Sequence, residues 1–112
     1  MDTAQRDPRE MTDEETRRWM EELVSKLVEK AGSAGGACSL EAIKNPIRRN
    51  ILKTLEDGAL EIDEISERLG VTGSALRYHL NLLKSSYFIQ IEGDKVDLTP
   101  GGVSVVRAYK RA

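Results

Sequence analysis

The chain has 112 residues, of which 39% are hydrophobic and 32% charged, as expected for one globular domain with extensions. Its net charge of −2 excludes an overall basic field, so any affinity for nucleic acid must come from local placement of charge. With only one cysteine and one histidine, the chain cannot build a disulfide framework or a zinc site of its own. It has no apolar run of about 18 residues and no signal peptide, so we expect a soluble cytoplasmic protein without a membrane partner.

The first third of the chain predicts a tail, a helix and a linker. Residues 1–11 are polar and predict a disordered tail, and Thr12 with Glu15 forms a capping box that opens a helix over residues 12–31. This helix carries an apolar stripe that cannot stay exposed, so it either folds back on the body or packs against a second copy. We favour a dimerisation helix because a flexible Gly/Ser/Ala linker follows at residues 32–38. The stripe consists of Trp19, Met20, Leu23, Val24, Leu27 and Val28.

Cys38 lies at the end of this linker. We expect a small, half-buried residue there, and a redox role or an intersubunit disulfide is the alternative.

Residues 39–71 predict short helices. A helical turn covers 39–44, and Asn45 with Pro46 then caps a helix that ends at Asp57-Gly58. Residues 59–62 are long enough for one small strand, and Asp63 caps a helix over 63–69 that Gly70 ends. A short helix, a tight turn with glycine and a longer helix form a helix-turn-helix arrangement.

The longer helix, residues 72–85, has two contrasting faces. Thr72 is a suitable N-cap through its hydroxyl, and Leu76, Leu80 and Leu83 recur at helical spacing. The opposite face is rich in donors and has no carboxylate, so the helix can lie in a DNA major groove, although an ordinary surface helix shows the same pattern. That face carries Ser74, Arg77, Tyr78, Asn81 and Lys84.

Residues 89–98 predict a hairpin with one register. A turn at Gly93-Asp94 places Ile89 opposite Leu98 and Ile91 opposite Val96, with all four side chains on one face. Thr99 and Pro100 then open a last helix, which carries Val103, Val106 and Tyr109 on one side.

Four segments resemble the ArsR-like winged helix-turn-helix regulators, especially those of archaeal type. They are residues 45–52 (NPIRRNIL), 65–71 (ISERLGV), 75–80 (ALRYHL) and 98–102 (LTPGG). The resemblance implies a mainly α fold with a small β-hairpin, in which residues 39–112 form the DNA-binding domain and an N-terminal and a C-terminal helix are added. It also implies a homodimer held by the terminal helices, whose interface we expect to include the stripe of residues 12–31 together with Val106 and Tyr109.

The resemblance further implies contacts with double-stranded DNA. Ser74, Arg77 and Tyr78 match positions that usually meet DNA, and His79 matches a histidine that we expect to be packed, with a phosphate contact or a pH role as the alternative. For Arg48 and Arg49 a solvated helix face is as good an interpretation as a phosphate contact. The full set of candidate DNA contacts is Gly73, Ser74, Arg77, Tyr78, Asn81, Lys84, Arg48, Arg49 and Lys95.

Two departures from the family limit the function. Residues 61–69 lack cysteine and residues 103–112 lack histidine and acids, so we expect no metal sensing and no cofactor. At the hairpin, Glu92, Asp94 and Asp97 outnumber Lys95, so we expect the wing to contribute little to DNA affinity.

We therefore expect a DNA-binding transcriptional regulator; no pattern identifies a small-molecule effector. The alternative is a winged-helix module that binds another protein, which the near-neutral charge and the acidic wing favour. No Ser/His/Asp set, phosphate loop or metal cluster supports an enzyme.

Overall fold

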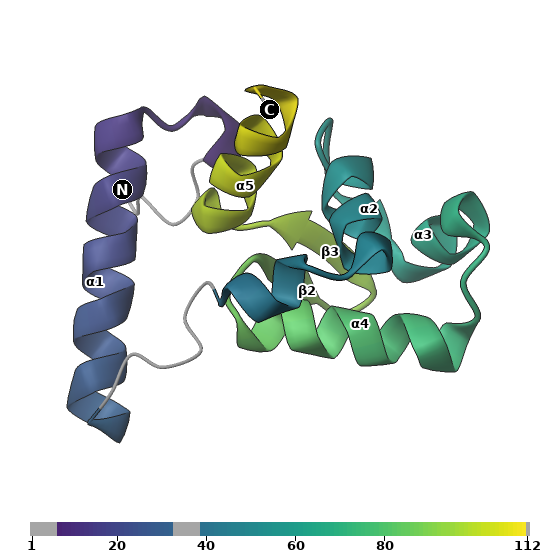
Figure 1. Cartoon of the computed structure of the whole chain (residues 1–112), viewed down its shortest axis with the longest axis horizontal. Coiled ribbons are helices and arrows are strands. Elements are labelled where there is room, and N and C mark those ends of the chain that lie inside the picture. The colour runs from purple at the N-terminus through teal and green to yellow at the C-terminus, as the bar shows by residue number, and fades with distance from the viewer. Residues whose placement is uncertain (1–6, 33–38, 112) are drawn as a thin grey trace.

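A computed structural model describes residues 7–32 and 39–111 of the chain. Figure 1 shows α1 along one side of the molecule beside α5, while α2, α3 and α4 surround the small sheet. The expected mainly α fold with a small β component is confirmed. The elements are η2 (Pro8–Glu10), α1 (Asp13–Ala31), η3 (Leu40–Ile43), α2 (Pro46–Thr54), β1 (Leu60–Glu61), α3 (Ile62–Leu69), α4 (Gly73–Ser85), β2 (Ile89–Glu92), β3 (Lys95–Leu98) and α5 (Pro100–Arg111).

One apolar core lies between the helices and the sheet. The leucine stripe of α4 supplies Leu76, Leu80 and Leu83, each at most 1% exposed. α2, α3, the strands and α5 complete this core, so α4 has a fixed inner face. The other fully buried large side chains are Ile51, Leu52, Leu55, Ile65, Phe88, Ile89, Val96 and Leu98.

The sheet has the predicted register. β2 and β3 pair antiparallel with Ile89 opposite Leu98 and Ile91 opposite Val96, which confirms the hairpin. β1 pairs with the other edge of β3, so β3 is the central strand. The Asp94 carbonyl accepts a hydrogen bond from the Ile62 N–H at 2.9 Å, which holds the hairpin tip against the start of α3.

The chain passes from α4 into β2 through a left-handed residue. Tyr87 has a φ of 65°, and its N–H donates to the Lys84 carbonyl at 3.0 Å while the Phe88 N–H donates to the Leu83 carbonyl at 3.0 Å. This pair of bonds is a Schellman motif, in which glycine is the usual residue at the left-handed position. The motif fixes the angle at which the hairpin leaves the helix.

The first turn of α5 lies directly against this junction. The Thr99 hydroxyl donates to the Tyr87 carbonyl at 2.6 Å and accepts from the Gly102 N–H at 3.2 Å. A Cβ atom added to Gly102 would lie 2.2 Å from the Phe88 carbonyl oxygen. Gly102 therefore allows α5 to lie closer to the junction of α4 and β2 than any larger residue at this position would.

Several boundaries differ from the sequence-based predictions, among them the end of α2, which comes at Thr54 and not at Asp57-Gly58. Residues 8–10 of the expected disordered tail form η2, and Pro8 is buried, because Arg9 binds carbonyl groups at the end of α2. Helix α3 begins one residue early, and Glu61 rather than Asp63 is its N-cap residue. The rest of the tail, most of the linker and Cys38 lie outside the described residues. Within the described ranges no helix has the length and apolarity needed to cross a membrane.

Candidate nucleic-acid interface

The turn between α3 and α4 holds the two helices in the helix-turn-helix arrangement. Gly70 ends α3 with a φ of 66°, a backbone conformation that glycine adopts without strain. The Ser66 hydroxyl donates to the Val71 carbonyl at 2.6 Å and closes the turn. The turn and the buried leucines together fix which face of α4 points outward.

The outward face of α4 is the proposed DNA-contacting surface. Gly73, Ser74, Arg77, Asn81 and Lys84 are all exposed. Tyr78 is 61% exposed, although its ring touches that of His79 edge-on with centroids 5.3 Å apart. α4 contains no acidic residue, so a phosphate approaching this face meets no negative side chain of the helix itself.

The N-terminus of α4 keeps its backbone donors. Thr72 takes the N-cap position, but its side chain makes no capping hydrogen bond, contrary to the expected role of the hydroxyl. Instead, its carbonyl accepts from the Leu76 N–H at 2.8 Å. The N–H groups of the first turn have no acceptor within the helix and form a suitable site for a phosphate oxygen.

Arg48 and His79 join α2 to the inner side of α4. The Arg48 Nε donates to the Ala42 carbonyl at 2.6 Å, and its Nη1 lies 3.0 Å from Nδ1 of His79. His79 is 8% exposed, and burial, followed by the charge of Arg48, lowers its pKa below the usual 6.5. Because a guanidinium can only donate, Nδ1 is the acceptor and the neutral imidazole carries its proton on Nε2. The packed interpretation of His79 therefore agrees with the geometry.

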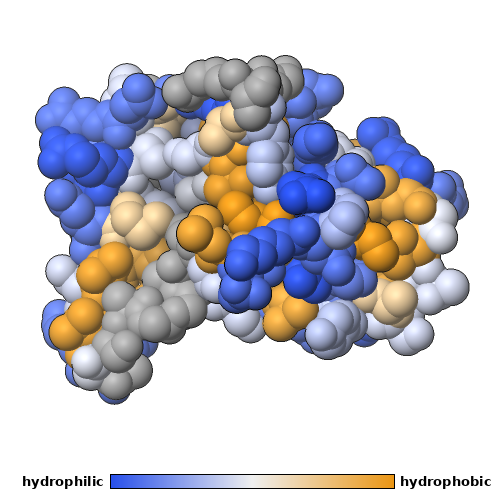
Figure 2. Space-filling model, viewed as in Figure 1, coloured by the Kyte–Doolittle hydropathy of each residue, from blue (hydrophilic) through white to orange (hydrophobic). Residues whose placement is uncertain are grey.

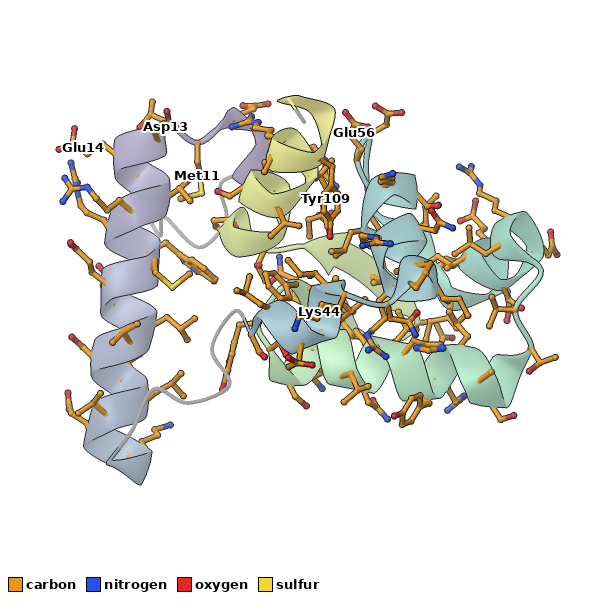
Figure 3. The ribbon with its side chains drawn as sticks, in the orientation of Figure 1. Met11, Asp13, Glu14, Lys44, Glu56 and Tyr109 are labelled. Atoms are coloured by element: carbon orange, nitrogen blue, oxygen red, sulfur yellow. The ribbon has the colours of Figure 1, made fainter. Side chains whose placement is uncertain are left out.

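Arg49 is half-buried near the end of α5. Tyr109 points from α5 toward α2 (Figure 3), and its hydroxyl is 3.5 Å from the Ile43 carbonyl. Burial raises the pKa of Tyr109, and the charge of Arg49 partly opposes this. The Lys53 Nζ lies 5.6 Å from the centre of the Tyr109 ring, so this surface of α2 serves packing between helices.

The wing places its basic residue between two acids. Lys95 pairs in register with Glu61 on β1 and with Glu92 on β2, and all three residues are exposed. Asp94 follows the turn glycine at the tip. The local charge at the wing is therefore negative, as the sequence predicts.

The apolar stripe of α1 remains partly uncovered by the rest of the described chain. α1 packs on α5, yet none of the side chains described in α1 is fully buried, and Val28 is 48% exposed. Figure 2 shows apolar surface on the lower half of α1. Of the two α5 residues expected at a dimer interface, Tyr109 is half-buried, and the expectation for Val106 is wrong because it is 3% exposed and belongs to the core.

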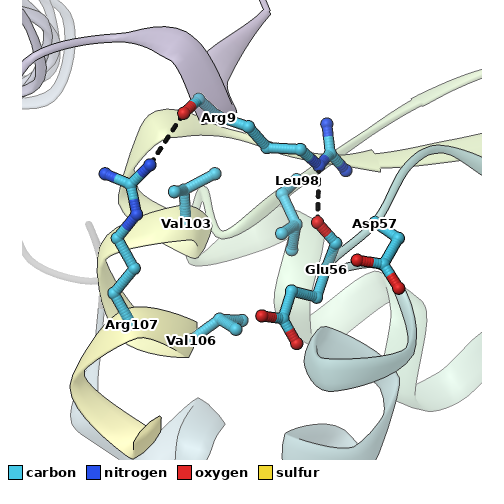
Figure 4. A pocket seen from close by; sticks show the side chains of 7 residues that line it. All are labelled: Arg9, Glu56, Asp57, Leu98, Val103, Val106 and Arg107. Carbon is cyan, nitrogen blue, oxygen red and sulfur yellow. Dashed lines mark hydrogen bonds between the residues drawn. The ribbon is translucent and has the colours of Figure 1, made fainter. Parts of the chain in front are cut away.

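Sequence patterns gave no indication of the contacts of Arg9. Its guanidinium binds carbonyl groups of Leu55 and Glu56 and the carboxylate of Asp97, and no periodic pattern or local motif connects these residues. A cavity of about 170 Å³ lies beside it (Figure 4). The residues that line this cavity are Arg9, Glu56, Asp57, Leu98, Val103, Val106 and Arg107.

The described residues contain no group of three His, Cys, Asp or Glu side chains arranged to hold a metal ion.

The helix-turn-helix pair, the hairpin that follows it and the exposed donor-rich face of α4 define a winged helix-turn-helix protein. Residues 45–90 match the family described as bacterial regulatory protein, arsR family. The chain belongs to this family. The narrower expectation of an archaeal type has no support in the comparisons.

Solved structures of bacterial regulators have the same fold. HlyU from Vibrio cholerae is 30% identical with a TM-score of 0.57, and the match covers 64% of this chain and 84% of that one. The transcriptional repressor BigR from Xylella fastidiosa is 19% identical with a TM-score of 0.59, over 85% and 90% of the two chains. The transcriptional regulator HlyU from Vibrio vulnificus is 23% identical with a TM-score of 0.56, over 85% and 95%. No curated protein sequence matches the chain.

Proposed function

We propose that the protein is a sequence-specific regulator of transcription that binds double-stranded DNA as a homodimer in the cytoplasm, and that it is not an enzyme. Residues 39–112 form its DNA-binding domain, and α4 enters the major groove. The observation that supports this proposal best is the outward face of α4, which is exposed, rich in donors and free of acids. A dimer of this kind reads two half-sites about 34 Å apart.

The exposed side chains of α4 differ in what they can recognise. Arg77 is the best candidate for base recognition, because its guanidinium can donate to O6 and N7 of one guanine. Tyr78 and Asn81 reach bases or phosphates, while Lys84 and the Gly73 and Ser74 N–H groups suit phosphates. Arg48 fits a phosphate contact less well, because two of its nitrogens already bind groups of the chain itself. Arg49 and Lys95 complete the proposed DNA contacts, and they contribute least to DNA affinity.

Selection of bound duplexes from a random pool tests the DNA proposal. We expect one preferred sequence, and we expect Arg77→Ala to cost about 1–3 kcal/mol of binding free energy and relax the preference at one base pair. Lys84→Ala should weaken binding to all sequences alike and reduce the salt dependence by about one phosphate contact. Lys26→Ala, an exposed position on α1, is the control. Uniform weakening by Arg77→Ala would show that Arg77 contacts the backbone instead.

The half-covered stripe of α1 supports a second copy of the chain as the partner. An apolar face of this length needs a cover, and the two-fold half-sites of this class of protein require two subunits. Val28→Asp introduces a charge at an exposed position of the stripe, so it should dissociate the dimer without unfolding the chain. Ser25→Asp, which is exposed and lies away from the stripe, is the matched control. Sedimentation at several protein concentrations distinguishes monomer from dimer, and a dimer unchanged by Val28→Asp would exclude this interface.

The acidic wing favours one alternative function, a module that binds another protein. Glu61, Glu92 and Asp94 gather at the hairpin around Lys95. Retention on random duplex at low salt separates the two functions. A DNA-binding protein with several phosphate contacts is eluted steeply by salt, whereas absence of retention supports the protein-binding module.

A further inference from the structure

A short segment before α1 binds across three elements of the DNA-binding domain through Arg9. The Arg9 Nε donates to the Glu56 carbonyl at 2.8 Å and Nη2 to the Leu55 carbonyl at 2.6 Å, both at the end of α2. Nη2 also pairs with the Asp97 carboxylate on β3, and Nη1 donates to Asp7 at 3.1 Å. All three guanidinium nitrogens are therefore engaged, and the side chain is only 18% exposed.

The backbone of the same residue is held by α5. The Arg107 Nη2 donates to the Arg9 carbonyl at 2.7 Å (Figure 4), and Pro8 beside it is buried. These contacts join residues 46 to 98 positions apart in the sequence. Residue 9 is thus fixed to α2, β3 and α5 at once.

This attachment lies immediately before α1. Thr12 caps the helix through a capping box, with Glu15 N–H to Thr12 Oγ1 at 3.1 Å and Thr12 N–H to Glu15 Oε1 at 2.9 Å. Two residues separate Arg9 from that cap, so a fixed Arg9 fixes the first turn of α1. Among the described residues α1 also packs on α5, through side chains that are only half-buried.

We propose that Arg9 is a positioning residue that sets the orientation of α1 against the DNA-binding domain, and thereby the half-site spacing that the homodimer accepts. If α1 carries the dimer contacts, the angle between α1 and α4 determines the distance between the two recognition helices. The part of this inference that concerns DNA rests on the proposed function. The part that concerns the orientation of α1 does not.

A distance measurement within one chain tests the orientation directly. Spin labels are attached at Glu22→Cys on α1 and Glu67→Cys on α3, two exposed positions, in a Cys38→Ser background. An excess of unlabelled chain removes distances between subunits. We expect one narrow distance distribution for the parent protein and a broadened or shifted one for Arg9→Gln. Arg17→Gln is the matched control, because Arg17 is 65% exposed and forms ion pairs with Glu14 and Glu21 of α1 itself.

The second measurement uses the selected operator with its half-sites moved apart or together one base pair at a time. The parent protein and Arg17→Gln should prefer one spacing sharply. Arg9→Gln should bind that spacing about tenfold or more weakly and should lose the preference, while its affinity for a single half-site stays unchanged. Avidity of about 10²–10⁴ depends on both subunits engaging at once, which is the quantity that a misplaced α1 reduces.

The outcomes separate the two proposals. An unchanged distance distribution in Arg9→Gln overturns the positioning role, whether or not DNA binds. A broadened distribution with an unchanged spacing preference overturns the link to half-site spacing. If the parent protein selects no duplex, the proposed function fails and the spacing role with it, while the distance measurement still decides whether Arg9 orients α1. If Arg9→Gln fails to fold by circular dichroism, Arg9→Lys replaces it, since it keeps the charge beside Asp97 but cannot make all the guanidinium bonds.

Discussion

Gly102→Ala should destabilise the fold although it replaces glycine by a better helix former. The new Cβ would lie 2.2 Å from the Phe88 carbonyl oxygen and 3.1 Å from Leu98 Cδ2. An ordinary C···O contact is about 3.3 Å, so α5 and the α4–β2 junction must separate by about 1 Å. The same carbonyl accepts the Thr99 N–H at 3.0 Å, and this bond is strained by the movement.

The opposing terms leave a net loss of stability. Overpacking costs about 1–3 kcal/mol, and a weakened hydrogen bond costs about 1 kcal/mol. The gain in helix propensity is at most about 1 kcal/mol. We therefore expect the free energy of unfolding to fall by about 1–3 kcal/mol. Each kcal/mol lost should lower the midpoint temperature of thermal unfolding by about 4 °C.

Urea unfolding followed by far-UV circular dichroism measures this loss. Protein concentration is held constant, because association of subunits would otherwise change the apparent stability. Gly73→Ala is the matched control: it also lies in the first turn of a helix, but a Cβ there meets nothing within 4 Å. Its stability should be unchanged or higher by up to about 1 kcal/mol. If Gly102→Ala is as stable as Gly73→Ala, α5 does not depend on a close approach at residue 102.

Two further predictions follow from His79 and from the wing. Because folding lowers the pKa of His79, the unfolded chain takes up the proton first as the pH drops, so the free energy of unfolding should fall below about pH 6.5. The variant His79→Gln still accepts a hydrogen bond from Arg48 but does not titrate, so it should flatten this pH dependence. Urea unfolding at several pH values measures the difference. Lys95→Ala should change DNA affinity about threefold or less, as expected for an exposed charge between two acids, whereas Asp94→Lys should strengthen binding at low salt. Loss of binding in Lys95→Ala with no effect of Asp94→Lys would show that the wing contacts DNA directly.

Local patterns predicted the parts of the fold that neighbouring residues determine. The leucine spacing of α4 and the alternation in β2 and β3 identified both faces of each element, and the hairpin register agrees pair by pair. Gly102 shows the limit of this reasoning. Propensity alone describes it as a weak start to a helix, whereas its role depends on Phe88, which belongs to another element.

Contacts between distant residues could not be predicted in this way. The bonds of Arg9 reach residues 55, 56 and 97, and an arginine in a polar N-terminal segment carries no periodic signal. Arg48 is a milder case, because its place on a helix face was apparent while its bond to His79, 31 residues later, was not. The exposed face of α4 was predictable, because the regular spacing of the leucines identifies the buried face and therefore the opposite one.

The long reach of Arg9 also has a consequence for synthesis of the chain on the ribosome. Arg107, which binds the Arg9 carbonyl, is translated 98 residues later. At about 5–20 residues per second, this delay lasts about 5–20 s. Until α5 has been made, α1 lacks the helix on which it packs, and its apolar stripe is open to water. Nascent chains that meet in this interval can pair before their DNA-binding domains are complete, so the order of folding and association depends on translation speed.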